Sequence, residues 1–160
     1  MGEEESHGWE TRQERVVAAK LKHLDYIQAA IARMATNSFL FKGWAITIAA
    51  ALSAFAAVNS QPALLAIALI STILFWGLDG YYLWLERGFI KLHEKVSARS
   101  EEDVDFSMKI DKRHAARTWF KTCWRPHLWI FYGSIAVIDA IGIYVVKTDV
   151  AGLMTKGPGR

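Results

Sequence analysis

Residues 130–146 read IFYGSIAVIDAIGIYVV, a run of apolar and small residues in which Asp139 is the only charged side chain. Extended back to His127, the run is about as long as an α-helix must be to cross the hydrocarbon core of a bilayer. A core helix of a soluble protein keeps a polar stripe along one face, and this run has almost none. It therefore predicts a transmembrane helix over residues 127–146.

Two further runs of the same kind come earlier in the chain. Residues 39–58 are apolar apart from Lys42 and scattered small polar residues, and residues 63–85 carry only Asp79 as a charged side chain. Overall, 52% of the residues are hydrophobic and 22% are charged, so the charges gather in the connecting segments. The sequence predicts an all-α membrane protein with three transmembrane helices, the first two paired as a hairpin over residues 39–85.

The distribution of Lys and Arg predicts the orientation. Residues 1–42 hold six of these cations and residues 86–127 hold ten, whereas the connector 59–62 holds none and the segment from Lys147 onward holds three. Because positively charged loops stay on the cytoplasmic side, we expect a membrane protein with a cytoplasmic amino terminus and an external carboxyl terminus. The excess positive charge would lie beside anionic headgroups, so membrane lipids are expected partners.

An amphipathic cytoplasmic helix is predicted over residues 11–38. Thr11 and Glu14 fit a capping box at its start, and apolar residues then recur every three or four positions. These residues are Val17, Leu21, Leu24, Ile27, Ile31 and Met34. No Gly or Pro interrupts the chain from Thr11 to Lys42. We therefore expect one long helix that continues into the first span, with Gly43 as the place for a kink.

The apolar stripe of this helix needs a partner, because an isolated helix would leave that face in water. The stripe either packs on the cytoplasmic segment of the same chain or forms a helix contact between subunits of a homo-oligomer. Residues 1–10 contain three consecutive Glu and two Gly. They are predicted to be disordered.

Residues 86–126 are predicted to form a cytoplasmic helical segment. Ser100, followed by acidic residues, marks one helix start, and Asp111 marks another. The last helix is expected to lie in the membrane interface, because apolar residues gather on one of its sides: Trp119, Phe120, Cys123 and Trp124. Pro126 would then open the third span. Residues 147–160 are expected to form a flexible external tail.

Three charged residues fall within or beside the spans: Lys42, Asp79 and Asp139. Asp79 lies near an aromatic stretch typical of a membrane interface. We expect it to bond a neighbouring helix, to pair with Lys42 or Arg87, or to line a polar path. Asp139 lies near the middle of its span, where an ionised carboxylate costs about 2.5 to 3.5 kcal/mol. It is therefore expected at a hydrogen-bonded helix interface, in a pore or ion path, or in a proton-transfer role.

The first span carries small residues at a four-residue step: Ala45, Ala49, Ser53 and Ala57. Small residues let helix backbones approach closely in lipid. We therefore expect these four residues to form a packing face, used either within the helix hairpin or between copies of the chain.

No catalytic, metal or cofactor site is predicted. Cys123 is the only cysteine, which excludes a disulfide within the chain and a cysteine-rich metal site. The five His residues never fall at the i, i+4 step of a helical metal site, and no glycine motif for phosphate binding or for a nucleophile occurs. Nucleic acid is not expected as a partner, because the ten cations of residues 86–127 alternate with seven acids. Enzymatic activity is not expected.

Two stretches carry a resemblance to known proteins. They read YIQAAIARMATNSFLFKGWAITIAAALSAF over residues 26–55 and ILFWGLDGYYLWLERGFIKLHEKV over residues 73–96. They resemble small bacterial inner-membrane proteins and, in general layout, antiphage-defence effectors: SLATT-like two-span proteins and ring-forming CRISPR-associated membrane proteins. The shared features are Asn37-Ser38-Phe39 before the first span and the polar exit of the second. The resemblance implies an oligomer that compromises the membrane during infection, although such effectors commonly have two spans rather than three.

Two functions from different classes are expected. The first is a homo-oligomeric inner-membrane effector that receives a cytoplasmic signal and permeabilises the bilayer, with Asp79 and Asp139 at interfaces or in the path. The alternative is a non-conducting membrane anchor or scaffold that recruits a cytoplasmic protein partner through residues 12–35 and 100–124. A small ion or proton channel comes third, because three spans give no inverted repeat.

Overall fold

The structure is a computed structural model that describes residues 2–100, 103, 105–110 and 115–155. Side chains are described over residues 12–100, 103, 105–110, 117–148 and 152. These residues contain helices and no strand, which confirms the all-α prediction. The four helices are α1 (Gly2–Asn59), α2 (Pro62–Ser97), α3 (Ala115–Cys123) and α4 (Pro126–Thr155).

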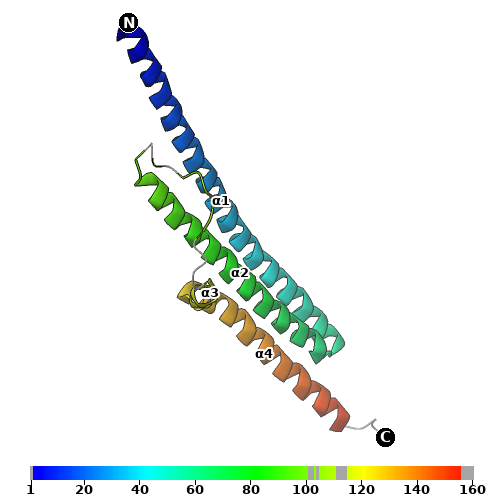
Figure 1. Cartoon of the computed structure of the whole chain (residues 1–160). Coiled ribbons are helices and arrows are strands. Elements are labelled where there is room, and N and C mark those ends of the chain that lie inside the picture. The colour runs from blue at the N-terminus through cyan, green and yellow to red at the C-terminus, as the bar shows by residue number, and fades with distance from the viewer. Residues whose placement is uncertain (1, 101–102, 104, 111–114, 156–160) are drawn as a thin grey trace.

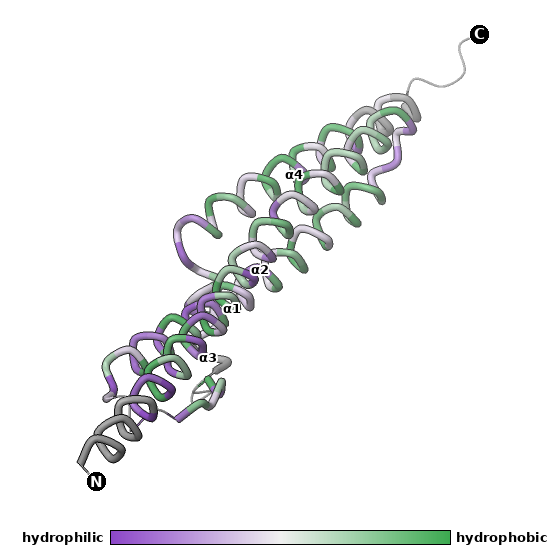
Figure 2. Tube along the Cα trace, turned by 90° about the horizontal axis from the view of Figure 1, so that it is seen from above, coloured by the Kyte–Doolittle hydropathy of each residue, from purple (hydrophilic) through white to green (hydrophobic). Residues whose placement is uncertain are grey.

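The helices form an elongated molecule with two different halves. Helices α1 and α2 lie side by side, and α4 lies along only one half of this pair, while the short helix α3 crosses near the start of α4 (Figure 1). Hydrophobic residues dominate the half with three helices, and hydrophilic residues dominate the half with two (Figure 2). The segments Arg12–Asn59, Pro62–Ser97 and Pro126–Thr148 are long and apolar enough to cross a membrane. Each of the three predicted spans lies within one of them.

Both ends of the chain are more helical than the sequence predicted. Helix α1 begins at Gly2, before the predicted start at Thr11, so residues 2–10 have a helical backbone where disorder was expected. It continues through Gly43 without interruption, and its 58 residues make a rod about 87 Å long. Helix α4 extends to Thr155, beyond the predicted end of the third span, into the stretch that was expected to be a flexible tail.

A short turn joins α1 to α2, as the hairpin prediction requires. Ser60 has a positive φ of 53°, and the backbone N–H of Gln61 donates to the carbonyl of Ala56 at 3.1 Å. This is the hydrogen bond that closes a helix through a left-handed residue, a position usually taken by Gly. Pro62 then opens α2, where its missing N–H has no cost.

The segment after α2 differs from the prediction of a helix starting at Ser100. Helix α2 ends at Ser97, and residues 105–110 have no helical structure. Ser100 begins only a short turn, in which its carbonyl accepts a bond at 3.2 Å from the N–H of Asp103, a residue in 3₁₀ conformation. The chain then packs on α1, where the Phe106 ring meets the His23 ring edge-on, with centroids 5.5 Å apart. The predicted start at Asp111 lies outside the described residues.

Three indole N–H groups join α3 to α2. Trp76 of α2 donates to the Cys123 carbonyl at 2.9 Å, and Trp84 donates to Thr118 Oγ1 at 2.9 Å. In return, Trp119 of α3 donates to the Gly77 carbonyl at 3.2 Å. The close approach requires a glycine, because a Cβ on Gly80 would lie 2.3 Å from the Cys123 sulfur.

The predicted apolar side of α3 divides into two pairs. Cys123 is buried and Trp119 is half-buried against α2, whereas Phe120 and Trp124 are exposed with ring centroids 6.2 Å apart. Each pair is spaced four residues apart, so each occupies its own line on the helix. Only the second pair is available for contact with lipid headgroups.

Cys123 makes the packing of α3 measurable. Burial raises the pKa of its thiol above the ordinary value, and the thiolate is the form that reacts with maleimides. N-ethylmaleimide should therefore label the folded protein slowly at neutral pH, and the rate should still be rising at pH values above about 8.5, the ordinary thiol pKa. A labelling rate at pH 7 equal to that of a free cysteine peptide would contradict this prediction.

Candidate functional site

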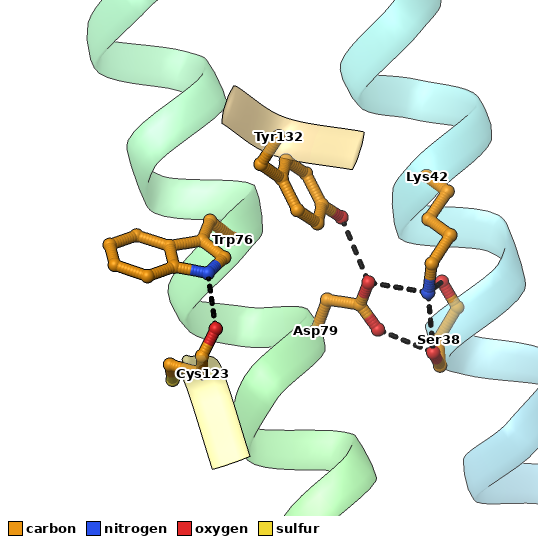
Figure 3. A network of polar contacts seen from close by, with 6 residues as sticks. All are labelled: Ser38, Lys42, Trp76, Asp79, Cys123 and Tyr132. Atoms are coloured by element: carbon orange, nitrogen blue, oxygen red, sulfur yellow. Dashed lines mark hydrogen bonds and ion pairs between the residues drawn. The ribbon is translucent and has the colours of Figure 1, made fainter. Parts of the chain in front are cut away.

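The most distinctive feature of the apolar half is a buried carboxylate, that of Asp79. Its side chain has no exposed surface, and three groups from the two neighbouring helices point toward it (Figure 3). Ser38 of α1 donates its hydroxyl to Oδ1, and Tyr132 of α4 donates its hydroxyl to Oδ2 at 3.1 Å. Asp79 therefore joins all three long helices at one level of the molecule.

Lys42 supplies the opposite charge. Its Nζ lies 2.5 Å from Asp79 Oδ2 and also donates to Ser38 Oγ at 2.9 Å. Of the two cations named as partners from the sequence, Lys42 and Arg87, the structure pairs Asp79 with Lys42. The Lys42 side chain is 26% exposed, so its ammonium reaches the edge of the bundle while the carboxylate stays inside. We call Ser38, Lys42, Asp79 and Tyr132 the shallow layer.

Asp139 forms a second polar level, which we call the deep layer. Its side chain is buried, Ser53 of α1 donates to Oδ1 at 3.3 Å, and Thr72 of α2 donates to Oδ2 at 3.5 Å. Both bonds are long, and Thr72 also donates to the Ala68 carbonyl at 3.0 Å. The partners of Asp139 belong to its own chain, so a second copy is not needed to satisfy this carboxylate.

Helical spacing relates the two layers. Thr72 and Asp79 are seven residues apart on α2, and Tyr132 and Asp139 are seven apart on α4, so each pair lies on one face, about 10 Å apart along the axis. Each layer thus takes one carboxylate and hydroxyl groups from the other helices. Ser38, Thr72 and Tyr132 were not among the predicted site residues. The seven-residue spacing from each acid is the sequence signal by which Thr72 and Tyr132 could have been found.

Apolar side chains occupy the positions between the layers. Ala45 and Tyr132 are buried in a cluster with Leu128, and Phe75 and Ile135 pack against this cluster. In the sequence, Phe75 lies between Thr72 and Asp79, and Ile135 lies between Tyr132 and Asp139. The described residues of one chain therefore offer no continuous row of polar side chains from one layer to the other.

The predicted packing face is found in part. Ala45 and Ala49 are buried and Ser53 is half-buried, but Ala57 is exposed and Ala56 is buried in its place. The reason is the 3.6-residue turn: a line drawn at steps of four rotates around the helix, and a step of three is needed to return to the same face. The face serves contacts within the chain, as Ser53 shows by its bond to Asp139.

The predicted apolar stripe of α1 also lies mostly against its own chain. Ile27 is fully buried, and four of the six residues are half-buried: Val17, Leu24, Ile31 and Met34. Leu21 is 57% exposed. The burial of Ile27 and its neighbour Ala30 results from the extension of α2 beyond the apolar half, where it continues beside α1 (Figure 1). The intramolecular alternative therefore accounts for most of this face, and Leu21 is left at its edge.

The chemistry of the site is that of charge pairing and hydrogen bonding. Among the described residues, no group of three or more His, Cys, Asp or Glu side chains is placed to hold a metal ion. The two carboxylates lie on different helices and in different layers, each with its own donors. Such an arrangement fixes the register of three helices, because sliding one of them would leave a buried carboxylate without its partners.

Comparison with known proteins adds no relative: no family model, no curated protein and no solved structure matches this chain.

Proposed function

We propose that the protein is a non-conducting anchor of the bacterial inner membrane that presents a rigid helix pair to a cytoplasmic partner. The supporting observation is that both acids of the apolar half have their hydrogen-bond partners inside one chain. A pore-lining acid faces water or another subunit, whereas Asp79 and Asp139 are buried among α1, α2 and α4. The apolar side chains of Phe75 and Ile135, which lie between the layers in the sequence and pack on one cluster, favour the same function.

The helix pair beyond the apolar half is the surface proposed for the partner. The exposed Leu21 and Tyr26 of α1 lie on this part, as do Phe106 and Met108 of the segment after α2. All four are large apolar side chains on an otherwise hydrophilic part of the molecule (Figure 2). In the proposed orientation, with the amino terminus in the cytoplasm, they face the cytoplasm.

A leakage experiment tests the proposal. The purified chain is reconstituted into vesicles loaded with carboxyfluorescein, and dye release is followed beside protein-free vesicles and vesicles with a pore-forming peptide. The anchor should release dye no faster than protein-free vesicles, and Asp139→Asn should leave the rate unchanged, because the amide oxygen still accepts a bond from Ser53 or Thr72 and the amide NH2 can donate to the other hydroxyl. Release above the protein-free rate that changes with Asp139→Asn would overturn the anchor.

A homo-oligomeric effector that permeabilises the membrane is the second candidate. The observation that favours it is the bare outer face of α4: only 11% of the apolar window of Pro126–Thr148 is buried within the chain. That face can meet lipid or the same helix of another copy. A monomeric mass in detergent would exclude a ring, whereas a discrete oligomer together with dye release would favour the effector.

A further inference from the structure

A basic groove lies beside the junction of α2 and α3, outside the polar layers. Its volume is about 840 Å³, within the range of small-molecule sites. Its walls come from the second half of α2, the end of the 105–110 segment and α3. The hydrogen bond from Trp84 to Thr118 joins α2 to α3. Ile110 holds the 105–110 segment against α2, because it packs so closely on Gly88 that a Cβ on Gly88 would lie 2.5 Å from Ile110 Cγ2.

The groove is positively charged, because cations spread over residues 87–125 of the sequence lie together along it. Six cations line it, and the only carboxylate among its described lining residues is Glu94. The six are Arg87, Lys91, Lys95, Lys109, Lys121 and Arg125. None of them forms an ion pair with another residue that the structure describes. Like charges held in one groove repel one another and raise the local concentration of anions, so an anionic ligand would stabilise this arrangement.

We propose that the groove binds a phosphate-bearing anion. Two of the cations are Arg87 and Arg125, whose guanidinium groups match phosphate oxygens in bidentate geometry, and the four Lys residues add point charges that neutralise a polyanion. The volume exceeds that of one inorganic phosphate, so the ligand carries several phosphates or a further polar group. This inference concerns binding and does not depend on whether the protein conducts.

The position of the groove brings two sources of phosphate within reach. Arg87 follows the apolar run 63–85 within α2, and Arg125 precedes Pro126 at the start of α4, so both lie at one end of an apolar stretch of sequence. In a bilayer this is the level of the lipid headgroups. Lys95 lies about 12 Å further along α2, beyond the headgroup layer and toward soluble ligands. A lipid headgroup and a soluble polyphosphate share the chemistry, and experiment distinguishes them.

The test uses the full chain in nanodiscs. In one arm, nanodiscs contain phosphatidylcholine with phosphatidylglycerol, and native mass spectrometry counts the phosphatidylglycerol retained after release from the disc. In the other, nanodiscs contain phosphatidylcholine alone, and calorimetry measures binding of inorganic tripolyphosphate. The groove variant is Arg87→Gln/Lys121→Gln/Arg125→Gln. The matched control, Arg12→Gln/Lys22→Gln/Arg33→Gln, removes the same charge from exposed positions of α1.

Binding in at least one arm should weaken about tenfold or more in the groove variant and less than about twofold in the control. Loss confined to the lipid arm assigns a headgroup, and loss confined to the tripolyphosphate arm assigns a soluble ligand. Lys91→Gln/Lys95→Gln changes only exposed side chains, so it keeps the test valid if the triple variant misfolds. Equal loss in groove and control variants, or binding in neither arm, would overturn the proposal. Tighter binding of a single-stranded oligonucleotide, lost in the groove variant, would overturn it in favour of nucleic acid.

Discussion

Replacing Lys42 by Met should destabilise the folded protein by about 3 to 5 kcal/mol, the cost of leaving a buried charge without its partner. Asp79 has no exposed surface, and Lys42 is the cation that pairs with it in the structure. Ser38 and Tyr132 would remain as donors, but neither carries a charge. The free energy of unfolding, measured by titrating SDS into mixed micelles, reports the loss.

Asp79→Asn should cost less, about 1 to 2 kcal/mol. The amide oxygen still accepts a hydrogen bond from Ser38 or Tyr132, and the amide NH2 can donate to the other hydroxyl. The Lys42 side chain, 26% exposed, can turn its charge toward solvent. The double variant Lys42→Met/Asp79→Asn should therefore lose clearly less free energy of unfolding than the two single variants lose together. Lys22→Met, at an exposed position of the same helix, is the control and should change little. Equal and additive losses at Lys42 and Asp79 would show that the ion pair contributes nothing specific.

Gly80→Ala should loosen the packing of α3 on α2. The new Cβ would lie 2.3 Å from the sulfur and 3.4 Å from the Cα of Cys123, so the Cys123 side chain or the helix that carries it has to move. Overpacking of this kind costs about 1 to 3 kcal/mol, although Ala itself favours a helix more than Gly does. Because Cys123 is the only cysteine, maleimide labelling reads the separation directly, and its rate should rise about tenfold or more.

Gly133→Ala is the matched control, because a Cβ at that position of α4 meets no atom within 4 Å. It makes the same chemical change in another apolar helix and should leave the labelling rate of Cys123 as it is. If Gly80→Ala also left that rate unchanged, the close packing of α3 on α2 would be wrong.

The sequence predicted the features that depend on chain-local composition. Three apolar blocks separated by charged or turn-forming segments predicted three helices. In lipid, a single apolar segment can satisfy all its backbone hydrogen bonds only as a helix. The Lys42–Asp79 pair was among the sequence alternatives, since a charged side chain in an apolar run has few available partners. The register of the deep layer was implicit in the spacing of Thr72 from Asp79 and of Asp139 from Tyr132.

Features that depend on how helices cross could not be predicted from one sequence. The acids and bases of residues 86–127 alternate along the chain. Arg87, Lys91 and Lys95 lie on α2 itself, and the packing of the 105–110 segment and of α3 on α2 brings Lys109, Lys121 and Arg125 to the same groove. Likewise, the segment after α2 is held by residues far away in the sequence: Lys20 Nζ donates to the Arg99 carbonyl at 2.7 Å, and the Phe106 ring packs on His23. The prediction that Ala57 belongs to the packing face was wrong, because a four-residue step departs from the 3.6-residue repeat of the helix.

The continuity of α1 has a mechanical consequence. A single stiff rod contains both the hydrophilic arm and the apolar stretch that holds Ser38 and Lys42, and no Pro or flexible joint divides it. Tilting or twisting the hydrophilic part of α1 therefore also moves its apolar part. If the proposed partner binds the hydrophilic part of α1, the motion would reach the Lys42–Asp79 contact through one continuous helix.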